Sequence, residues 1–175
     1  MNTENTLSLE GILDEPLIFG FDLSFSTRAL DREPLLEISP VRFEGQVVRV
    51  EGGYSLDGHL WYSGRLECSR CLEPYPFDED QDFSLLLYKR RAPTSEEVAL
   101  DDEDLDVWFY DDPKVPVAPI AEERIQIAVP MKPLCREDCR GLCPRCGQDL
   151  NEGLCGCAVE SIDPRWEALQ RLKKA

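Results

Sequence analysis

The chain has 175 residues and a formal net charge of −16, from 35 acidic residues against 19 lysines and arginines. This length suits one domain, or one domain with a small appendage, and it is long enough to bury a core. The strong negative charge repels phosphate backbones, so it argues against a general nucleic-acid coat. It is compatible with binding a basic protein, such as a ribosomal protein, although acidic charge also serves solubility alone.

The sequence indicates no membrane segment and no export signal. It has no apolar run of about 18 residues, which a membrane-spanning helix requires. Residues 1–6 lack a basic region followed by an apolar stretch, so we expect no signal peptide. We therefore expect a cytoplasmic protein, in which closely spaced cysteines bind metal or do redox chemistry more often than they form disulfides.

The first ninety residues predict β-strands. Val41, Phe43 and Val47 alternate with polar neighbours, and Val48 and Val50 then continue in the opposite phase. This change of phase suggests a bulge or a strong twist near Val47.

Short turns are expected to join the next strands. The pairs Gly52-Gly53 and Asp57-Gly58 are turn signals. Further strands are expected over 60–68, over 83–87 and, as a short segment, over 107–110. Short connections favour antiparallel pairing, so we predict an α+β fold whose body is a mainly antiparallel sheet with few helices.

The remaining elements divide the chain into two predicted parts. Residues 93–106 are so acidic that we expect an exposed loop there. Apolar residues at three- and four-residue steps predict a helix over 119–129, and a second short helix is expected after Asp163. We therefore predict a β-rich body over 1–130 and a cysteine-rich, zinc-ribbon-like module with a C-terminal helix over 131–175, packed on the body.

The eight cysteines carry the clearest chemical signal, because they fall into four close pairs. Paired thiols at such spacing can present two sulfurs to one metal ion, and two pairs complete a tetrahedral zinc site. The pairs are Cys68/Cys71, Cys135/Cys139, Cys143/Cys146 and Cys155/Cys157. The sequence therefore predicts one or two zinc ions, held by these eight residues.

Four pairs can be joined two by two in three ways. We favour the grouping in which Cys143, Cys146, Cys155 and Cys157 form one site, because that site closes a short loop at little entropic cost. The other site then joins Cys68 and Cys71 to Cys135 and Cys139, which staples the cysteine-rich module to the sheet. The chief rival places Cys135, Cys139, Cys143 and Cys146 together.

Closed sites of this kind favour a structural role. Four thiolates saturate zinc and leave no open position for substrate or water. Arg136, Arg140 and Arg145 balance the negative charge of the sites, or else present a small basic face to RNA. The single histidine, His59, is expected at the surface in a turn. The sequence contains no recognisable catalytic set, so we predict neither an enzyme nor a small-molecule substrate.

Several stretches resemble a known family. The first is Leu66-Glu-Cys-Ser-Arg-Cys-Leu-Glu-Pro74, and the second runs from Pro130-Met-Lys-Pro-Leu-Cys135 through Cys139-Arg-Gly-Leu-Cys-Pro-Arg-Cys-Gly147 to Asn151 and Cys155-Gly-Cys157. Together with Asp163-Pro-Arg-Trp166 they resemble the YceD family, named for the accumulation of large ribosomal RNA. The resemblance covers roughly residues 40–172.

The resemblance implies a role in the accumulation or processing of 23S ribosomal RNA, and hence in large-subunit assembly. It supplies no catalytic residue. Our leading hypothesis is therefore a non-enzymatic assembly factor that contacts a ribosomal protein or the rRNA-processing machinery. The alternatives are a thiol-based redox sensor, with Cys143 and Cys146 as the exchanging pair, and a zinc protein that contacts RNA directly.

Overall fold

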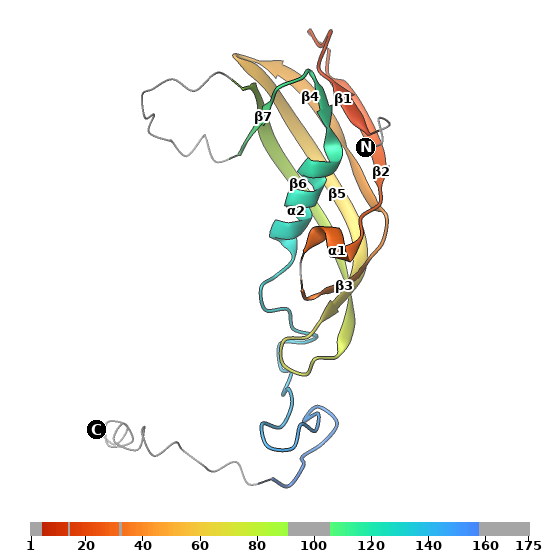
Figure 1. Ribbon diagram of the computed structural model, residues 1–175, viewed down its shortest axis with the longest axis vertical. Helices are drawn as coiled ribbons and strands as arrows, with labels where there is room; N and C mark the ends of the chain where they lie inside the picture. Colours follow the sequence, from red (N-terminus) through yellow and green to blue (C-terminus); the bar gives the residue numbers. More distant parts are fainter. Residues whose placement is uncertain (1–4, 14, 32, 91–105, 158–175) are drawn as a thin grey trace, which may run out of the picture.

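The computed structural model (Figure 1) describes residues 5–13, 15–31, 33–90 and 106–157. Its main element is a six-stranded sheet in which β2, β4, β5, β6 and β7 follow one another and β3 pairs with β5. The strands are β2 (Leu17–Leu23), β3 (Leu35–Ile38), β4 (Val41–Val50), β5 (Gly53–Glu67), β6 (Pro74–Lys89) and β7 (Val107–Tyr110). A small antiparallel sheet pairs β1 (Thr6–Ser8) with β8 (Lys114–Pro116).

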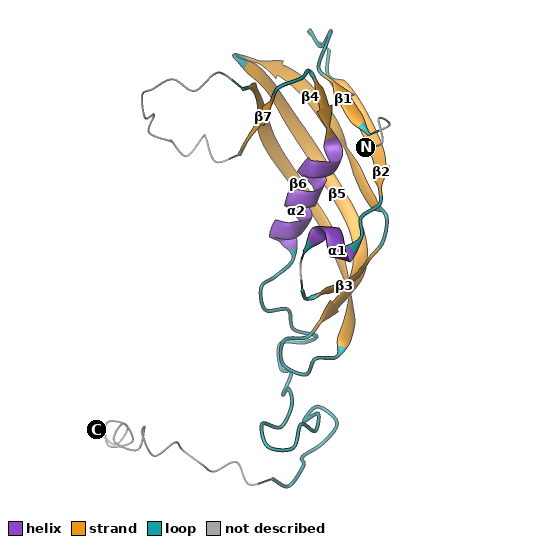
Figure 2. Ribbon diagram, in the orientation of Figure 1, coloured by secondary structure: helices purple, strands orange, loops and turns teal. Residues whose placement is uncertain are grey.

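Two helices cover one face of the large sheet (Figure 2). They are α1 (Thr27–Leu30) and α2 (Val117–Ala128). Side chains at alternate strand positions face these helices and form the core, because successive residues of a strand point to opposite faces. The core includes Val41, Phe43, Val47, Leu56, Leu60, Tyr62, Leu85, Leu87, Ile120 and Ile125. The predicted class, a mainly antiparallel sheet with few helices, is confirmed.

The helix predicted over 119–129 is confirmed, with a slightly earlier start. It begins at Val117, and the rigid backbone of Pro116 forms its N-cap without a side-chain hydrogen bond. Pro119 lies in the first turn, where a missing N–H costs nothing. The short helix α1 was not predicted. There, Ser26 caps the first turn by accepting a hydrogen bond from the Ala29 N–H at 3.2 Å.

Of the two expectations near Val47, a bulge or a strong twist, the bulge was wrong. β4 pairs with β5 in unbroken register from Arg42 opposite Trp61 to Val50 opposite Gly53. Val48 and Val50 lie half-buried on the other face of the same regular strand. The register shift of this sheet instead lies between β3 and β5, between Leu35 and Glu37.

The turn expected at Asp57-Gly58 was also wrong, because both residues lie within β5. Gly58 is needed there for space: a Cβ atom would lie 2.7 Å from the ring of Phe83 and 2.8 Å from that of Phe43. The glycine therefore marks close packing rather than a reversal of the chain. Gly52, with a φ of 84°, forms the real turn between β4 and β5.

The strand predicted over 107–110 is confirmed as β7, but it pairs with β6 in parallel. Most of the acidic loop predicted over 93–106 and the C-terminal helix predicted after Asp163 lie outside the described residues. Asp106 is described, and its carboxylate accepts a hydrogen bond from Arg124 at 3.1 Å. Among the described helices, neither is long and apolar enough to cross a membrane.

Candidate metal centres

The first cluster of sulfurs lies at the end of the sheet where β5 passes into β6. Cys68 and Cys71 occupy the turn between these strands, and Cys135 and Cys139 come from the segment after α2. The sulfurs of Cys68 and Cys139 are 3.8 Å apart, as are those of Cys71 and Cys135. All four sulfurs lie within 4.8 Å of one another.

Backbone hydrogen bonds shape the turn that carries Cys68 and Cys71. The Leu72 N–H donates to the Cys68 carbonyl at 2.9 Å, and the Cys68 N–H donates to the Glu73 carbonyl at 3.1 Å. Leu72 adopts the left-handed conformation, with a φ of 63°. The Ser69 N–H donates to the Pro133 carbonyl at 2.8 Å, which joins the turn to the segment after α2.

Arg70, which the sequence analysis did not single out, fastens the same two segments. Its guanidinium donates to the carbonyls of Glu137 at 3.1 Å and Cys139 at 2.9 Å. The Arg70 carbonyl in turn accepts from the Leu142 N–H at 3.1 Å. Gly141 lies so close that a Cβ atom there would stand 2.7 Å from this carbonyl oxygen. The position between two cysteines was the signal that could have identified Arg70.

The second cluster lies within one short stretch of chain, and its four sulfurs are also within 4.8 Å of one another. It comprises Cys143, Cys146, Cys155 and Cys157. Gly147, with a φ of 75°, donates its N–H to the Cys143 carbonyl at 2.9 Å. The Cys143 N–H donates to the Gln148 carbonyl at 2.8 Å, and the Arg145 N–H approaches the Cys143 sulfur at 3.5 Å.

The structure thus brings the eight cysteines together in the grouping that the sequence favoured. The rival grouping of Cys135 and Cys139 with Cys143 and Cys146 is not formed, because these pairs belong to different clusters. In Figure 1 the segment with the second cluster, coloured blue, extends beyond the end of the sheet. Figure 2 draws this whole segment as loop.

The sulfur geometry fits a tetrahedral metal ion. A regular tetrahedron with metal–sulfur bonds of ~2.3 Å has sulfur–sulfur edges of about 3.8 Å. In the first cluster, the Cys68–Cys139 and Cys71–Cys135 sulfur separations are both 3.8 Å. A disulfide requires sulfurs at ~2.05 Å, and all eight cysteines are free thiols. Both clusters can therefore hold a metal ion with four sulfur ligands.

The environment favours one thiolate in each cluster. Burial works to raise the pKa of Cys68, but backbone hydrogen bonds from Cys135, Cys71 and Arg70 overcome it and lower that pKa to about 6. Backbone hydrogen bonds from Arg145 and Cys146 lower the pKa of Cys143 to about 6 as well. Amide donors of this kind stabilise negative charge on sulfur.

Other thiols in the same clusters resist ionisation when no cation is present. A backbone hydrogen bond at Glu73 works to lower the pKa of Cys71, but burial and the neighbouring sulfurs raise it to about 12. Hydrogen bonds with Cys146 and Cys155 raise the pKa of Cys157 to about 12. Four thiolates this close repel one another, and a divalent cation is the group that removes the repulsion.

The three arginines near the clusters are all exposed, but their surroundings differ. The Arg136 guanidinium pairs with Asp138 at 3.4 Å and donates to the side chain of Asn151 at 2.8 Å. Within the part of the chain that the structure describes, the guanidinium groups of Arg140 and Arg145 form no ion pair. Arg136 is therefore engaged within the protein, whereas Arg140 and Arg145 are available at the surface.

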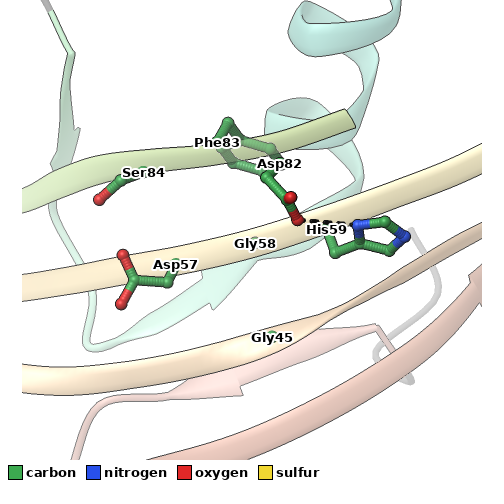
Figure 3. Close-up of a pocket in the computed structure, with 7 residues that line it drawn as sticks. All are labelled: Gly45, Asp57, Gly58, His59, Asp82, Phe83 and Ser84. Atoms are coloured by element: carbon green, nitrogen blue, oxygen red, sulfur yellow. Dashed lines mark hydrogen bonds and ion pairs between the residues drawn. The ribbon is translucent and has the colours of Figure 1, made fainter. Parts of the chain in front are cut away.

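His59 lies in a shallow hollow on the sheet face opposite the helices (Figure 3). It is a residue of β5 rather than of a turn, which corrects the expectation for its setting. Its imidazole contacts Asp82 at 2.9 Å and Asp80 at 3.4 Å. The hydroxyl of Ser84 lies on the Asp57 side of the hollow, away from the imidazole, so the residues shown form no serine–histidine pair.

The chain is similar to several curated proteins. It is 30% identical to an uncharacterized protein of Mycobacterium tuberculosis over 141 residues, which is 81% of this chain and 63% of that protein. It is 28% identical to the protein of Zea mays named large ribosomal RNA subunit accumulation protein YCED homolog 1, chloroplastic, over 81% of this chain and 56% of the relative. The namesake in Arabidopsis thaliana is 25% identical over 78% of this chain and 49% of the relative.

These curated relatives are longer, and the chain spans between about half and under two thirds of their length. No solved structure matches the chain. The family described as large ribosomal RNA subunit accumulation protein YceD matches residues 56–173, which include both cysteine clusters. The chain therefore belongs to the YceD family.

Proposed function

We propose that this chain is a non-enzymatic factor that supports accumulation or processing of 23S ribosomal RNA, and so biogenesis of the large ribosomal subunit. Membership of the YceD family supports this role. The observation that carries the mechanism is the pair of closed sulfur clusters, each with four ligands at metal-binding separation. In such a site no position remains for substrate, so the proposed role of the metal is structural.

The proposed metal is zinc, because tetrahedral four-sulfur sites suit that ion. When bound, zinc supplies positive charge that keeps four thiolates together. Around the first cluster, Cys68 and Cys71 then fix the β5–β6 turn to the segment of Cys135 and Cys139. Residues 144–157 contain no buried side chain, so that stretch depends on its cysteines for a defined shape.

The uncovered face of the sheet is the proposed site for a basic protein partner. Strand positions that face away from the helices carry exposed carboxylates, among them Glu44, Asp57, Asp80 and Asp82. Trp61 lies among them with 48% of its surface exposed. Carboxylates pair with lysine and arginine, and an exposed indole ring attracts the same cations. A ribosomal protein or a basic processing enzyme meets these requirements.

Depletion and complementation test the proposed function in the organism of origin. Depletion is expected to lower mature 23S rRNA relative to 16S rRNA, and the wild-type gene is expected to restore it. A Cys68→Ser/Cys139→Ser variant is expected to restore it less well, whereas Ser69→Ala, an exposed neighbour, is expected to match the wild type. Unchanged 23S rRNA on depletion would contradict the proposal.

A thiol-based redox sensor is the second candidate, and the lowered pKa of Cys143 favours it. Metal content and thiol reactivity separate the two functions. A structural zinc protein is expected to contain about two zinc ions per chain and thiols that react only after chelation. Reversible oxidation of Cys143 and Cys146 in the metal-loaded protein would favour the sensor instead.

Direct RNA contact is the third candidate, and the exposed guanidinium groups of Arg140 and Arg145 favour it. It requires an affinity for rRNA that falls steeply with salt and falls further in Arg140→Gln/Arg145→Gln. For the whole chain we still propose a protein partner, because a net charge of −16 repels the RNA phosphate backbone. Unspecific, salt-independent RNA retention would not support this candidate.

The proposed compartment is reducing, such as the cytoplasm, because thiolates must stay reduced to bind zinc. The two plant relatives carry the word chloroplastic in their names. A fluorescent fusion of the full chain tests the location, which is expected to be cytoplasmic and to overlap with ribosomes.

A further inference from the structure

Asn151 lies in the loop between Cys146 and Cys155. Both cysteines belong to the second cluster, so this cluster fixes both ends of the loop. Its backbone N–H donates to Asp149 Oδ1 at 2.8 Å, and its side-chain Nδ2 donates to the same oxygen at 2.7 Å. The Leu150 N–H donates to the Gly141 carbonyl at 2.9 Å. These bonds hold the loop against the stretch that follows Cys139.

The same side chain reaches the first cluster. Its Nδ2 donates to the sulfur of Cys139 at 3.4 Å. Its Oδ1 accepts from the Arg140 N–H at 2.9 Å and from the Arg136 guanidinium at 2.8 Å. A residue of the second loop is thus a hydrogen-bond donor to a sulfur of the first cluster.

The chemistry of the amide explains why asparagine suits this position. An amide offers two N–H donors and an oxygen that accepts two bonds, and Asn151 uses all four. The opposite orientation of the amide would place its oxygen against the Asp149 carboxylate and the Cys139 sulfur. Aspartate keeps the acceptor oxygens but provides no donor to sulfur.

A hydrogen bond to a metal-bound sulfur orients the ligand and disperses its charge, and outer partners of this kind change metal affinity by about 10- to 100-fold. The loop that presents Asn151 has no buried side chain over 144–157, so closure of the second cluster adds to the few hydrogen bonds that order it. Closure of one cluster therefore places a donor on a ligand of the other.

We infer that Asn151 is a positioning residue that couples the two clusters, so that the first and second metal ions bind cooperatively. This inference rests on the proposed metal sites, and it adds an energetic link between them. Because coupling between two binding sites is reciprocal, each ion raises the affinity of the other by the same factor.

Cadmium titration of the full-length protein tests the inference, because Cd²⁺ binds thiolates and its NMR spectrum gives each site a separate resonance. Dissociation constants come from competition with a chelator. Asn151→Ala and Asn151→Asp are expected to weaken the first site by about 10- to 100-fold. They are also expected to shift its cadmium resonance. Gln148→Ala removes an exposed amide from the same loop and is expected to leave both readouts unchanged.

A double-mutant cycle identifies the coupling. Cys157→Ser opens the second cluster and is expected to weaken the first site by a similar factor, and Asn151→Ala is expected to add little in that background. Additive effects, or an Asn151→Asp protein with the first-site affinity and resonance of Gln148→Ala, would overturn the inference while the metal sites stand. A wild-type protein that binds neither Cd²⁺ nor Zn²⁺ would remove the metal proposal itself.

Discussion

His59 is held between two carboxylates on the exposed face of the sheet. Its hydrogen bond with Asp82 raises the imidazole pKa above the ordinary value of 6.5. Because the pKa is raised in the folded state, the pair stabilises the fold fully below the unfolded pKa, and this contribution is lost as pH rises through the folded pKa. For so exposed a pair we expect well under about 1 kcal/mol.

An NMR titration measures this pKa directly, since His59 is the single histidine of the chain. Asp82→Asn is expected to lower the imidazole pKa, whereas Asp57→Asn, which removes a carboxylate that pairs with Gln46, is expected to change it less. A wild-type pKa at or below 6.5 would show that the pair does not form in solution.

At Gly45, the adjacent strand β5 leaves no room for a side chain. A Cβ atom there would lie 2.1 Å from the Asp57 carbonyl oxygen of β5. Gly45→Ala is therefore expected to lower the free energy of unfolding by about 1–3 kcal/mol in urea titrations. Gly153→Ala places its methyl group in open space and is expected to change that free energy by less than about 0.5 kcal/mol. Equal effects of the two substitutions would contradict the packing.

At the scale of elements, α2 packs against one face of the sheet, and its two faces differ sharply in solvent exposure. Ile125 is 0% exposed and Ile127 is 66% exposed. Ile125→Ala is expected to cost about 2–5 kcal/mol of unfolding free energy, because it leaves a cavity in the core. Ile127→Ala is expected to change it by about 0.5 kcal/mol or less. Urea denaturation of both proteins, followed by far-UV circular dichroism, measures the difference.

The sequence predicted α2 and the central strands because their apolar residues repeat with a clear period. It did not predict α1 or the parallel pairing of β7. The four residues of α1 are too few to show a period, and they are fixed by the Ser26 cap and burial of Leu30. Pairing direction depends on the path of the chain between strands, which the pattern within β7 does not contain. The prediction for Gly58 was wrong because the sequence cannot distinguish a glycine that forms a turn from one that makes room for neighbouring rings.

The cysteine grouping was predictable for a physical reason, because the spacing within 143–157 closes a short loop at low entropic cost. The residues around the clusters were less accessible to prediction. Arg70 contacts a segment 69 residues further along the chain, and Asn151 reaches from the second loop back to Cys139; no periodicity marks either contact. The division into a body over 1–130 and a module over 131–175 stays a prediction.

At the scale of the whole molecule, one sheet face is covered by helices and the other presents acid groups around Trp61. Binding to purified basic large-subunit ribosomal proteins is expected to weaken with salt and to fall in Asp80→Asn/Asp82→Asn and in Trp61→Ala. Glu123→Gln on α2 removes a carboxylate from the other side of the sheet and serves as the control. Binding that depends equally on Glu123 would indicate a diffuse charge effect instead of a contact with this face.

The central claim is that two separate four-sulfur sites each hold one zinc ion. Native mass spectrometry of the full chain under saturating zinc tests it, in the wild type and in single cysteine variants. We expect two zinc ions in the wild type and one in Cys68→Ser and Cys135→Ser, with the second cluster still loaded. Cys143→Ser is expected to keep the zinc of the first cluster. Loss of the same zinc ion from Cys135→Ser and Cys143→Ser, or a wild-type chain without zinc, would contradict the account.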